Sequence, residues 1–209
     1  MSKEQPATRY VLNEIYPTVQ GEGTHAGIPM TIVRLQGCGV GCPWCDSGAT
    51  WPSGGSFLSA DDIASEAAKD KIGGEIALIT GGEPANYHLR PLVRSLKSAG
   101  FKAVHLETSG TALGHVGAGF DWVTISPKFG MRLPTLPEAF ARCDELKAVI
   151  PDELTLDALD AFLPTIPPPG RLSIQPVFGD PSSLSLCLRT AMDRGWRLSI
   201  QTHKHIGIK

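Results

Sequence analysis

The sequence predicts an α/β fold: a partial, open (β/α) barrel of about six parallel strands, built as a single domain over residues 1–209. Short β-branched and apolar runs alternate along the chain with helical stretches, which is typical of a parallel sheet. Polar or glycine-rich stretches follow strand after strand, and the carboxyl ends of parallel strands meet at one ligand-binding edge. Six or seven strands are too few to close an eight-stranded barrel, so we expect an open one.

Each expected element has a local signal in the sequence. Ser59 and Asp62 form an N-cap pattern that predicts the start of a helix, and Gly100 predicts the end of the next one. A proline-rich stretch at 164–170 reads as a connection over a site. The apolar and β-branched runs predict strands at 31–36, 76–80, 102–107, 122–126, 145–150, 172–177 and 197–201. The helices are expected at 61–69, 90–99, 154–162 and 182–194.

Composition excludes several classes of function. The net charge is −2 at pH 7, which provides no basic face for a nucleic acid, so we expect no nucleic-acid partner. No apolar run approaches the roughly 20 residues of a membrane span, so no membrane association is expected. The polar segment Met1–Gln5 lacks the apolar stretch of a signal peptide, and the sequence therefore predicts a cytoplasmic protein.

Three of the five cysteines, Cys38, Cys42 and Cys45, lie within eight residues in the spacing C-x3-C-x2-C. Thiolates are the soft ligands that iron–sulfur clusters and zinc prefer. Three thiolates would leave one iron of a 4Fe-4S cluster open to an outside molecule. A zinc site completed by a distant residue such as His203 is the alternative, and disulfides are a weaker one. Cys143 and Cys187 are expected to be plain buried thiols.

The cysteine loop, with the aromatic Trp44 directly before its last cysteine, resembles the radical S-adenosylmethionine superfamily. That resemblance implies the open barrel of that superfamily and a 4Fe-4S cluster whose open iron is chelated by S-adenosylmethionine. Electron transfer to the sulfonium then yields a 5′-deoxyadenosyl radical, and Trp44 would lie near the adenine. Gly81-Gly82-Glu83-Pro84 supports the resemblance, because two glycines let the backbone approach a ligand and a carboxylate can accept from an ammonium group.

Further motifs narrow the family: Q-G-E-G at 20–23, Asp46-Ser47 after the cysteines, E-T-S-G at 107–110, S-P-K at 126–128 and Q-T-H-K at 201–204. Together with Arg34 and Gln175-Pro176, they resemble the 7-carboxy-7-deazaguanine synthases from about Val11 to Lys209. The resemblance implies a lyase that converts 6-carboxy-5,6,7,8-tetrahydropterin to 7-carboxy-7-deazaguanine and ammonia by radical ring contraction. This reaction belongs to queuosine biosynthesis, a tRNA modification pathway. The deoxyadenosyl radical abstracts the hydrogen, so no protein residue is expected to be catalytic.

The resemblance also assigns site residues. Substrate binding falls on Val19, Gln20, Gly21, Arg34, Thr80, Gln201, His203 and Lys209. S-adenosylmethionine binding falls on Trp44, Asp46, Gly82, Glu83, Ser126, Pro127, Lys128, Gln175, Pro176, Val177 and Phe178. Cys38, Cys42 and Cys45 would hold the cluster and Ser47 a Mg²⁺ ion. From the residues alone, Arg34 could equally be a surface strand arginine and Lys128 a solvated loop lysine.

Two positions depart from the family pattern. Ser47 stands where the family commonly has threonine, but a serine hydroxyl offers the same oxygen. Lys209 is an unusual residue at the position whose terminal carboxylate would reach the pterin ring. The family further implies a homodimer and an electron donor such as flavodoxin. A glycyl-radical-activating enzyme and a non-catalytic zinc-binding module remain alternatives to the synthase.

Overall fold

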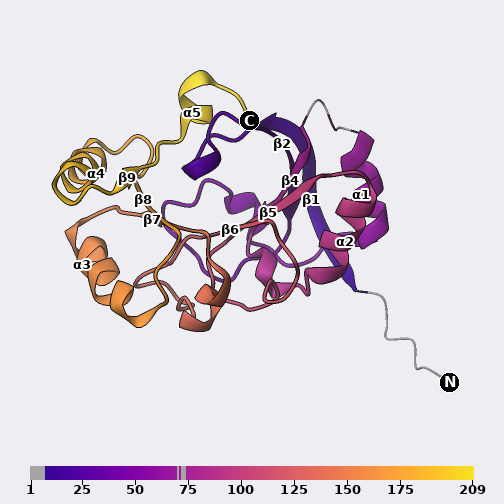
Figure 1. The fold of residues 1–209 in the computed structure, drawn as a ribbon, viewed down its shortest axis with the longest axis horizontal. Helices are drawn as coiled ribbons and strands as arrows, with labels where there is room; N and C mark the ends of the chain where they lie inside the picture. The colour runs from indigo at the N-terminus through magenta and orange to yellow at the C-terminus, as the bar shows by residue number, and fades with distance from the viewer. Residues whose placement is uncertain (1–7, 70, 72–73) are drawn as a thin grey trace.

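The structure, a computed structural model, describes residues 8–69, 71 and 74–209, and the N-terminal segment discussed above lies outside this part. One nine-stranded sheet runs through the molecule in the order β3-β1-β2-β4-β5-β6-β7-β8-β9 (Figure 1). The strands are β1 (Arg9–Val19), β2 (Pro29–Leu35), β3 (Phe57–Ser59), β4 (Ile76–Gly81), β5 (Ala103–Thr108), β6 (Trp122–Ile125), β7 (Glu145–Val149), β8 (Arg171–Gln175) and β9 (Arg197–Leu198).

The strands pair in parallel along the series β2-β4-β5-β6-β7-β8-β9, whereas β1 pairs antiparallel with both β2 and β3. The two ends of the sheet, β3 and β9, do not pair with each other, so the barrel is open. The predicted α/β class and open parallel barrel are confirmed. The parallel part has one strand more than the expected six, and two antiparallel strands extend it.

Helices surround the sheet from outside (Figure 1): α1 (Ala60–Lys69), α2 (Arg90–Ser98), α3 (Glu153–Phe162) and α4 (Pro181–Arg194). Asp152 caps α3 by accepting from the Thr155 amide at 2.8 Å, and Gly195 ends α4 in a left-handed conformation. The main hydrophobic core lies between these helices and the sheet. It contains alternate residues of the strands, such as Val104 and Leu106 of β5.

The opposite face of the parallel strands is polar. Because side chains alternate along a strand, His105 and Glu107 share the face of β5 that Val104 and Leu106 do not use. Glu145 and Lys147 occupy the equivalent positions on β7. The sheet therefore separates a dry core under the helices from a polar interior inside the open barrel.

Four elements differ from the predictions, and one of them is the short edge strand β3, which no sequence pattern predicted. β1 was not expected, because a register shift between Leu12 and Glu14 breaks the two-residue pattern that marks a strand. The last predicted strand is only Arg197–Leu198, since the chain turns at Gln201 to make contacts across the barrel mouth. The turn leads into an unpredicted short helix, α5 (Thr202–Ile206), which Gly207 ends.

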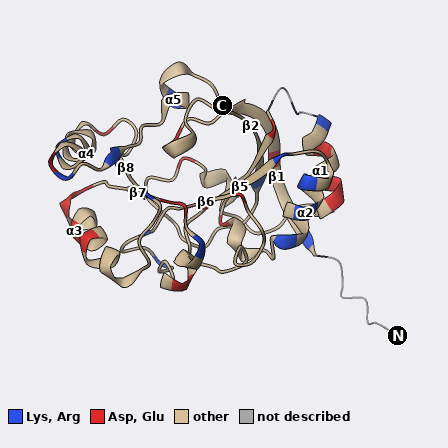
Figure 2. Cartoon of the chain, viewed as in Figure 1, with Lys and Arg blue, Asp and Glu red and all other residues tan. Residues whose placement is uncertain are grey.

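Within the described residues, no helix is long and apolar enough to cross a membrane. Lysine, arginine, aspartate and glutamate are distributed along the ribbon rather than gathered in one segment, and α1 carries both signs (Figure 2).

Candidate active site

A cavity of about 570 Å³ opens at the carboxyl ends of the parallel strands. The cysteine loop, β1, the ends of β4 to β8 and the C-terminal segment around α5 line it. This is the edge at which the sequence predicted that the motifs would converge.

The cysteine loop places Cys38, Cys42 and Cys45 on the cavity wall, and all three are free thiols. Backbone hydrogen bonds fix the loop, including Cys38 N–H to the Trp51 carbonyl at 3.2 Å and Cys45 N–H to the Cys42 carbonyl at 3.1 Å. The Trp51 indole N–H also donates to the Cys45 sulfur at 3.3 Å. Burial raises the pKa of the Cys42 thiol, and the charges of Cys45 and Cys38 raise it further, although Lys128 opposes the shift.

Three free thiols on the wall of one cavity can hold three irons of a 4Fe-4S cluster and leave the fourth iron open to a ligand. His203, the proposed fourth zinc ligand, instead groups with Glu22 and Asp46.

The Gly-Gly-Glu-Pro stretch clamps the start of the cysteine loop. The Gly82 N–H donates to the Leu35 carbonyl at 3.0 Å, and the Glu83 N–H donates to the Gly37 carbonyl at 2.9 Å. A Cβ atom on Gly82 would lie 2.4 Å from the Gly37 carbonyl oxygen, and one on Gly81 would lie 2.1 Å from that of Leu35. The glycines are therefore needed for the close approach of the two backbones at this point.

Glu83 lies apart from the other motif residues. The resemblance assigned its carboxylate to the methionyl amino group, but Glu83 is 1% exposed and does not line the cavity. Its two oxygens accept hydrogen bonds from the Ala85 amide, the Thr108 hydroxyl, and the amide and hydroxyl of Ser109. Because these donors occupy both carboxylate oxygens, Glu83 links the end of β4 to the end of β5. It thereby stabilises the backbone next to the cavity without facing the cavity itself.

A buried lysine lies at the base of the cavity. The Lys147 ammonium pairs with Glu22 and, at 3.2 Å, with Glu107, which also accepts from the Gln20 amide at 3.2 Å. Burial would raise the pKa of Glu22, but Lys147 and a hydrogen bond from Gln201 outweigh it and lower this pKa to about 2. Burial alone would lower the pKa of Lys147, but the two glutamates raise it. Glu22 and Lys147 are therefore both charged near neutral pH.

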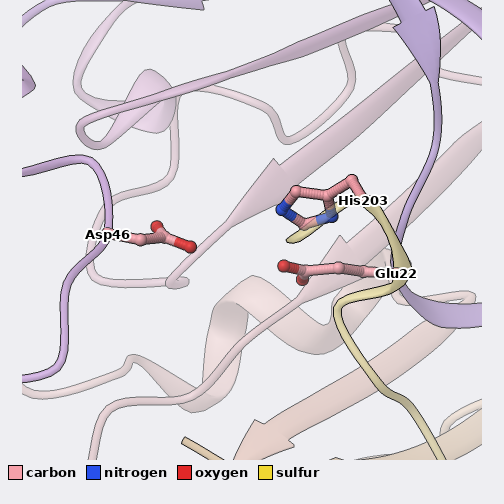
Figure 3. A group of neighbouring side chains, drawn as sticks. All are labelled: Glu22, Asp46 and His203. Carbon is pink, nitrogen blue, oxygen red and sulfur yellow. The ribbon is translucent and has the colours of Figure 1, made fainter. Parts of the chain in front are cut away.

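Figure 3 shows the Glu22 and Asp46 carboxylates and the His203 ring pointing toward one another, with ligand atoms within 4.8 Å. The Gln201 side-chain amide bridges the two carboxylates at 2.6 Å and 2.9 Å. Lys204 pairs with Asp46 at 2.8 Å, and this contact outweighs burial and lowers the Asp46 pKa to about 2. Lys147 and Lys204 neutralise these carboxylates, and the Lys204–Asp46 ion pair holds α5 to the cysteine loop.

Arg34 is not a surface arginine, because its side chain is only 18% exposed and lines the cavity. Its guanidinium donates to Glu14 at 2.9 Å, to the Ser47 hydroxyl at 3.1 Å and to the Tyr16 hydroxyl at 2.8 Å. Ser47 in turn donates to Asp46 at 3.2 Å. The arginine thus sits in a fixed position beside the Ser47 hydroxyl, which was predicted to bind Mg²⁺.

Lys128 is likewise not a solvated loop lysine. It lines the cavity, and its ammonium donates to the Ser126 hydroxyl at 2.7 Å. Burial lowers its pKa, which the nearby Cys42 and Glu22 oppose. Of the two other cysteines, Cys187 is buried as expected and Cys143 is partly buried.

The structure brings together almost all the predicted site residues. Every one lines the cavity except Glu83 and Pro127. Several cavity residues were absent from the predicted set: Glu14, Tyr16, Glu22, Glu107, Lys147 and Lys204. Glu107 and Lys147 had a usable signal, because each is a charged residue that directly follows a buried leucine in a strand.

Comparison with known proteins agrees with this geometry. The family model described as the Radical SAM superfamily matches residues 32–142. A 7-carboxy-7-deazaguanine synthase of Escherichia coli (strain K12) is 35% identical over 96% of this chain and 99% of its own length. One from Synechocystis sp. is 34% identical, covering 96% of this chain and 94% of the relative. The crystal structure of QueE from Escherichia coli superposes with a TM-score of 0.82 at 34% identity, covering 93% of this chain and 95% of the other.

Proposed function

Because the chain belongs to the radical S-adenosylmethionine superfamily and, within it, to the 7-carboxy-7-deazaguanine synthases, we propose that it converts 6-carboxy-5,6,7,8-tetrahydropterin to 7-carboxy-7-deazaguanine and ammonia. The observation that carries this proposal is one cavity of about 570 Å³ that contains both the three-thiol loop and a polar, charged base. That volume is in the range of small-molecule sites. Neither a glycyl-radical-activating enzyme nor a zinc-binding module agrees with this combination.

The cluster would be held by Cys38, Cys42 and Cys45. When bound, it supplies the electron that cleaves S-adenosylmethionine to a deoxyadenosyl radical. The protein's own contribution is to bind and orient the two small molecules and to exclude water. The Gly82 backbone, Lys128 and the 175–178 turn lie on the cluster side and are assigned to S-adenosylmethionine. Lys128 provides a buried cation for its carboxylate.

The pterin would bind between Gln20, Thr80 and α5. Arg34 is suited to the substrate carboxylate, because its guanidinium is held in place by three partners and two of its five N–H groups have no recorded partner in the described chain. Its burial also strengthens an interaction with an anion.

Magnesium is part of the proposal. The Ser47 hydroxyl and the neighbouring Asp46 carboxylate are the hard oxygen ligands that Mg²⁺ prefers, and both face the cavity. This donor set fits the ion, with Ser47 as its protein ligand. The proposal also includes that the protein forms a homodimer, receives electrons from a donor such as flavodoxin and is located in the cytoplasm.

The direct test is an anaerobic assay of the reconstituted protein with 6-carboxytetrahydropterin, S-adenosylmethionine and a reductant. We expect 7-carboxy-7-deazaguanine, identified by mass, and a stoichiometric amount of ammonia. A Cys42→Ala variant is the control and should form neither. If the wild-type protein cleaves S-adenosylmethionine but forms no deazaguanine, the superfamily assignment stands and the substrate assignment does not.

A further inference from the structure

Below the active-site cavity lies a second, much smaller space of about 10 Å³, which we term the floor chamber. Its polar walls include Glu22, Glu107, Glu145, His25, His105 and Trp122. A space of this size and polarity accommodates about one water molecule. Nearby, the buried Thr24 hydroxyl has no hydrogen-bond partner in the described chain, although the Thr24 amide donates to Glu145 at 3.0 Å.

The floor chamber and the active-site cavity share a wall. Glu22 and Glu107 line both spaces. Both oxygens of Glu22 are occupied, one by Lys147 and one by Gln201, and its low pKa keeps it ionised. Glu107 differs, because Oε1 accepts both of its hydrogen bonds and Oε2 accepts none from the described chain. Glu107 is therefore the carboxylate of the shared wall that has an oxygen free to take a proton.

The far side of the chamber ends at His25, which is only partly buried. Its ring lies 4.6 Å from that of His105 and 4.5 Å, edge on, from that of Trp122. Burial lowers the pKa of His25, while the charges of Glu145 and Asp144 oppose this shift. His105 is more deeply buried and its pKa is about 4, so its ring stays neutral. His25 is thus the imidazole of the chamber that is placed to exchange protons with solvent.

We propose that the floor chamber is a proton-transfer site, in which a water molecule passes protons between His25 on the solvent side and Glu107 at the base of the active-site cavity. The inference rests on the proposed function. With the tetrahydropterin and S-adenosylmethionine in place and α5 across the mouth, the floor provides a route for protons that does not cross the substrates.

The proposed reaction needs such a route. The bond from carbon to the departing nitrogen breaks with its electron pair on nitrogen, which takes one proton as ammonia forms. A ring carbon gives up one proton as the pyrrole ring becomes aromatic, and the electron pair of that C–H bond forms the ring double bond. No external oxidant is required, and the two protons balance. At neutral pH the released ammonia takes one further proton from water. Glu107 is placed to mediate these transfers as general acid and base.

The test is His25→Gln, which keeps a polar side chain but does not titrate. We expect turnover of the tetrahydropterin to fall about tenfold or more, with KM little changed, and a solvent deuterium isotope effect larger than that of the wild type. His88→Gln, at an exposed histidine outside both cavities, is the matched control and should behave as wild type.

A second variant separates proton transfer from packing. In His25→Ala, added imidazole should restore turnover in proportion to the basicity of the imidazole used, which a purely structural role would not produce. Turnover of His25→Gln within about twofold of wild type between roughly pH 6 and 9, or no rescue of a folded His25→Ala protein, would overturn the relay. Absence of deazaguanine formation by the wild type would instead refute the proposed function.

Discussion

The Glu83 carboxylate accepts four hydrogen bonds from groups at and just beyond the ends of β4 and β5, and it is almost fully buried. Hydrogen bonds to a buried charged group stabilise more than neutral ones, and removing a partner leaves polar groups unsatisfied. In Glu83→Gln one carboxylate oxygen becomes an N–H₂ group, which cannot accept a hydrogen bond from Ser109 or Thr108 and leaves those donors unsatisfied. We expect the free energy of unfolding of the apo protein to fall by about 2 kcal/mol or more, measured with urea. The exposed Glu138→Gln is the control, and equal denaturation midpoints would contradict this role.

His105 makes stability depend on pH. Burial lowers its pKa from 6.5 to about 4 in the folded protein. The unfolded chain therefore binds more protons between these values, so this contribution is complete above about pH 6.5 and is lost as the pH falls toward 4. The loss should be on the order of 2 kcal/mol. Denaturation curves of His105→Leu and wild type between these pH values test this, and parallel pH profiles would exclude His105 as the cause.

Removing the Ser47 hydroxyl tests whether this oxygen binds Mg²⁺. Its hydroxyl contacts Arg34 and Asp46 but no cysteine, so Ser47→Ala should leave the cluster intact. Stimulation of turnover by Mg²⁺ should weaken severalfold, because the ion keeps few protein ligands and loses one of them. Iron content and turnover against Mg²⁺ concentration provide the two readouts. A response to Mg²⁺ equal to that of wild type would remove Ser47 from the site.

At the scale of elements, the junction of β4 with the cysteine loop depends on glycine. A side chain at Gly82 would displace the Gly37 carbonyl and, with it, the loop that starts at Cys38. Gly82→Ala should therefore reduce iron incorporation severalfold on reconstitution, while far-UV circular dichroism stays close to wild type. Gly48→Ala is the matched control near the same loop, because a Cβ atom there meets nothing within 4 Å. Equal iron contents for both variants would contradict this prediction, because they would show that displacing the Gly37 carbonyl does not disturb the cysteine loop.

The same scale shows what the sequence could and could not predict. The parallel strands and the main helices were predicted, because each is a local run of apolar or helix-forming residues with a clear end signal. β1 was missed because its register shift at Leu12 and Glu14 breaks the alternating pattern, and α5 was missed because its conformation depends on partners far along the chain. For example, the Thr202 amide donates to the Gly21 carbonyl at 2.9 Å, and no local pattern encodes that pairing.

Motif residues of the site were predicted from short sequence matches, but the polar base of the cavity was not. Lys147 is recognisable in retrospect as a lysine that is 4% exposed and stands between the apolar Leu146 and Ala148 of β7. Its partners Glu22 and Glu107 lie 125 and 40 residues away, so only the folded barrel brings them together. A motif identifies Glu83 but not the direction of its side chain, which does not line the cavity in the structure.

For the whole molecule, the sheet divides two environments. The hydrophobic core under the helices stabilises the fold, whereas the barrel interior contains buried ion pairs whose desolvation is costly. Buried charged groups of this kind are typical of a ligand-binding site, whereas the stability of the fold comes mainly from the hydrophobic core. The central claim is that three thiols at the mouth of this interior hold a cluster whose fourth iron faces the cavity.

Electron paramagnetic resonance of the anaerobically reconstituted, reduced protein, recorded with and without S-adenosylmethionine, tests this claim most directly. We expect a reduced 4Fe-4S signal that changes its g values when S-adenosylmethionine is added, because the ligand binds the iron that has no cysteine. A protein that takes up zinc but no iron, or a cluster signal that S-adenosylmethionine leaves unchanged, would contradict it.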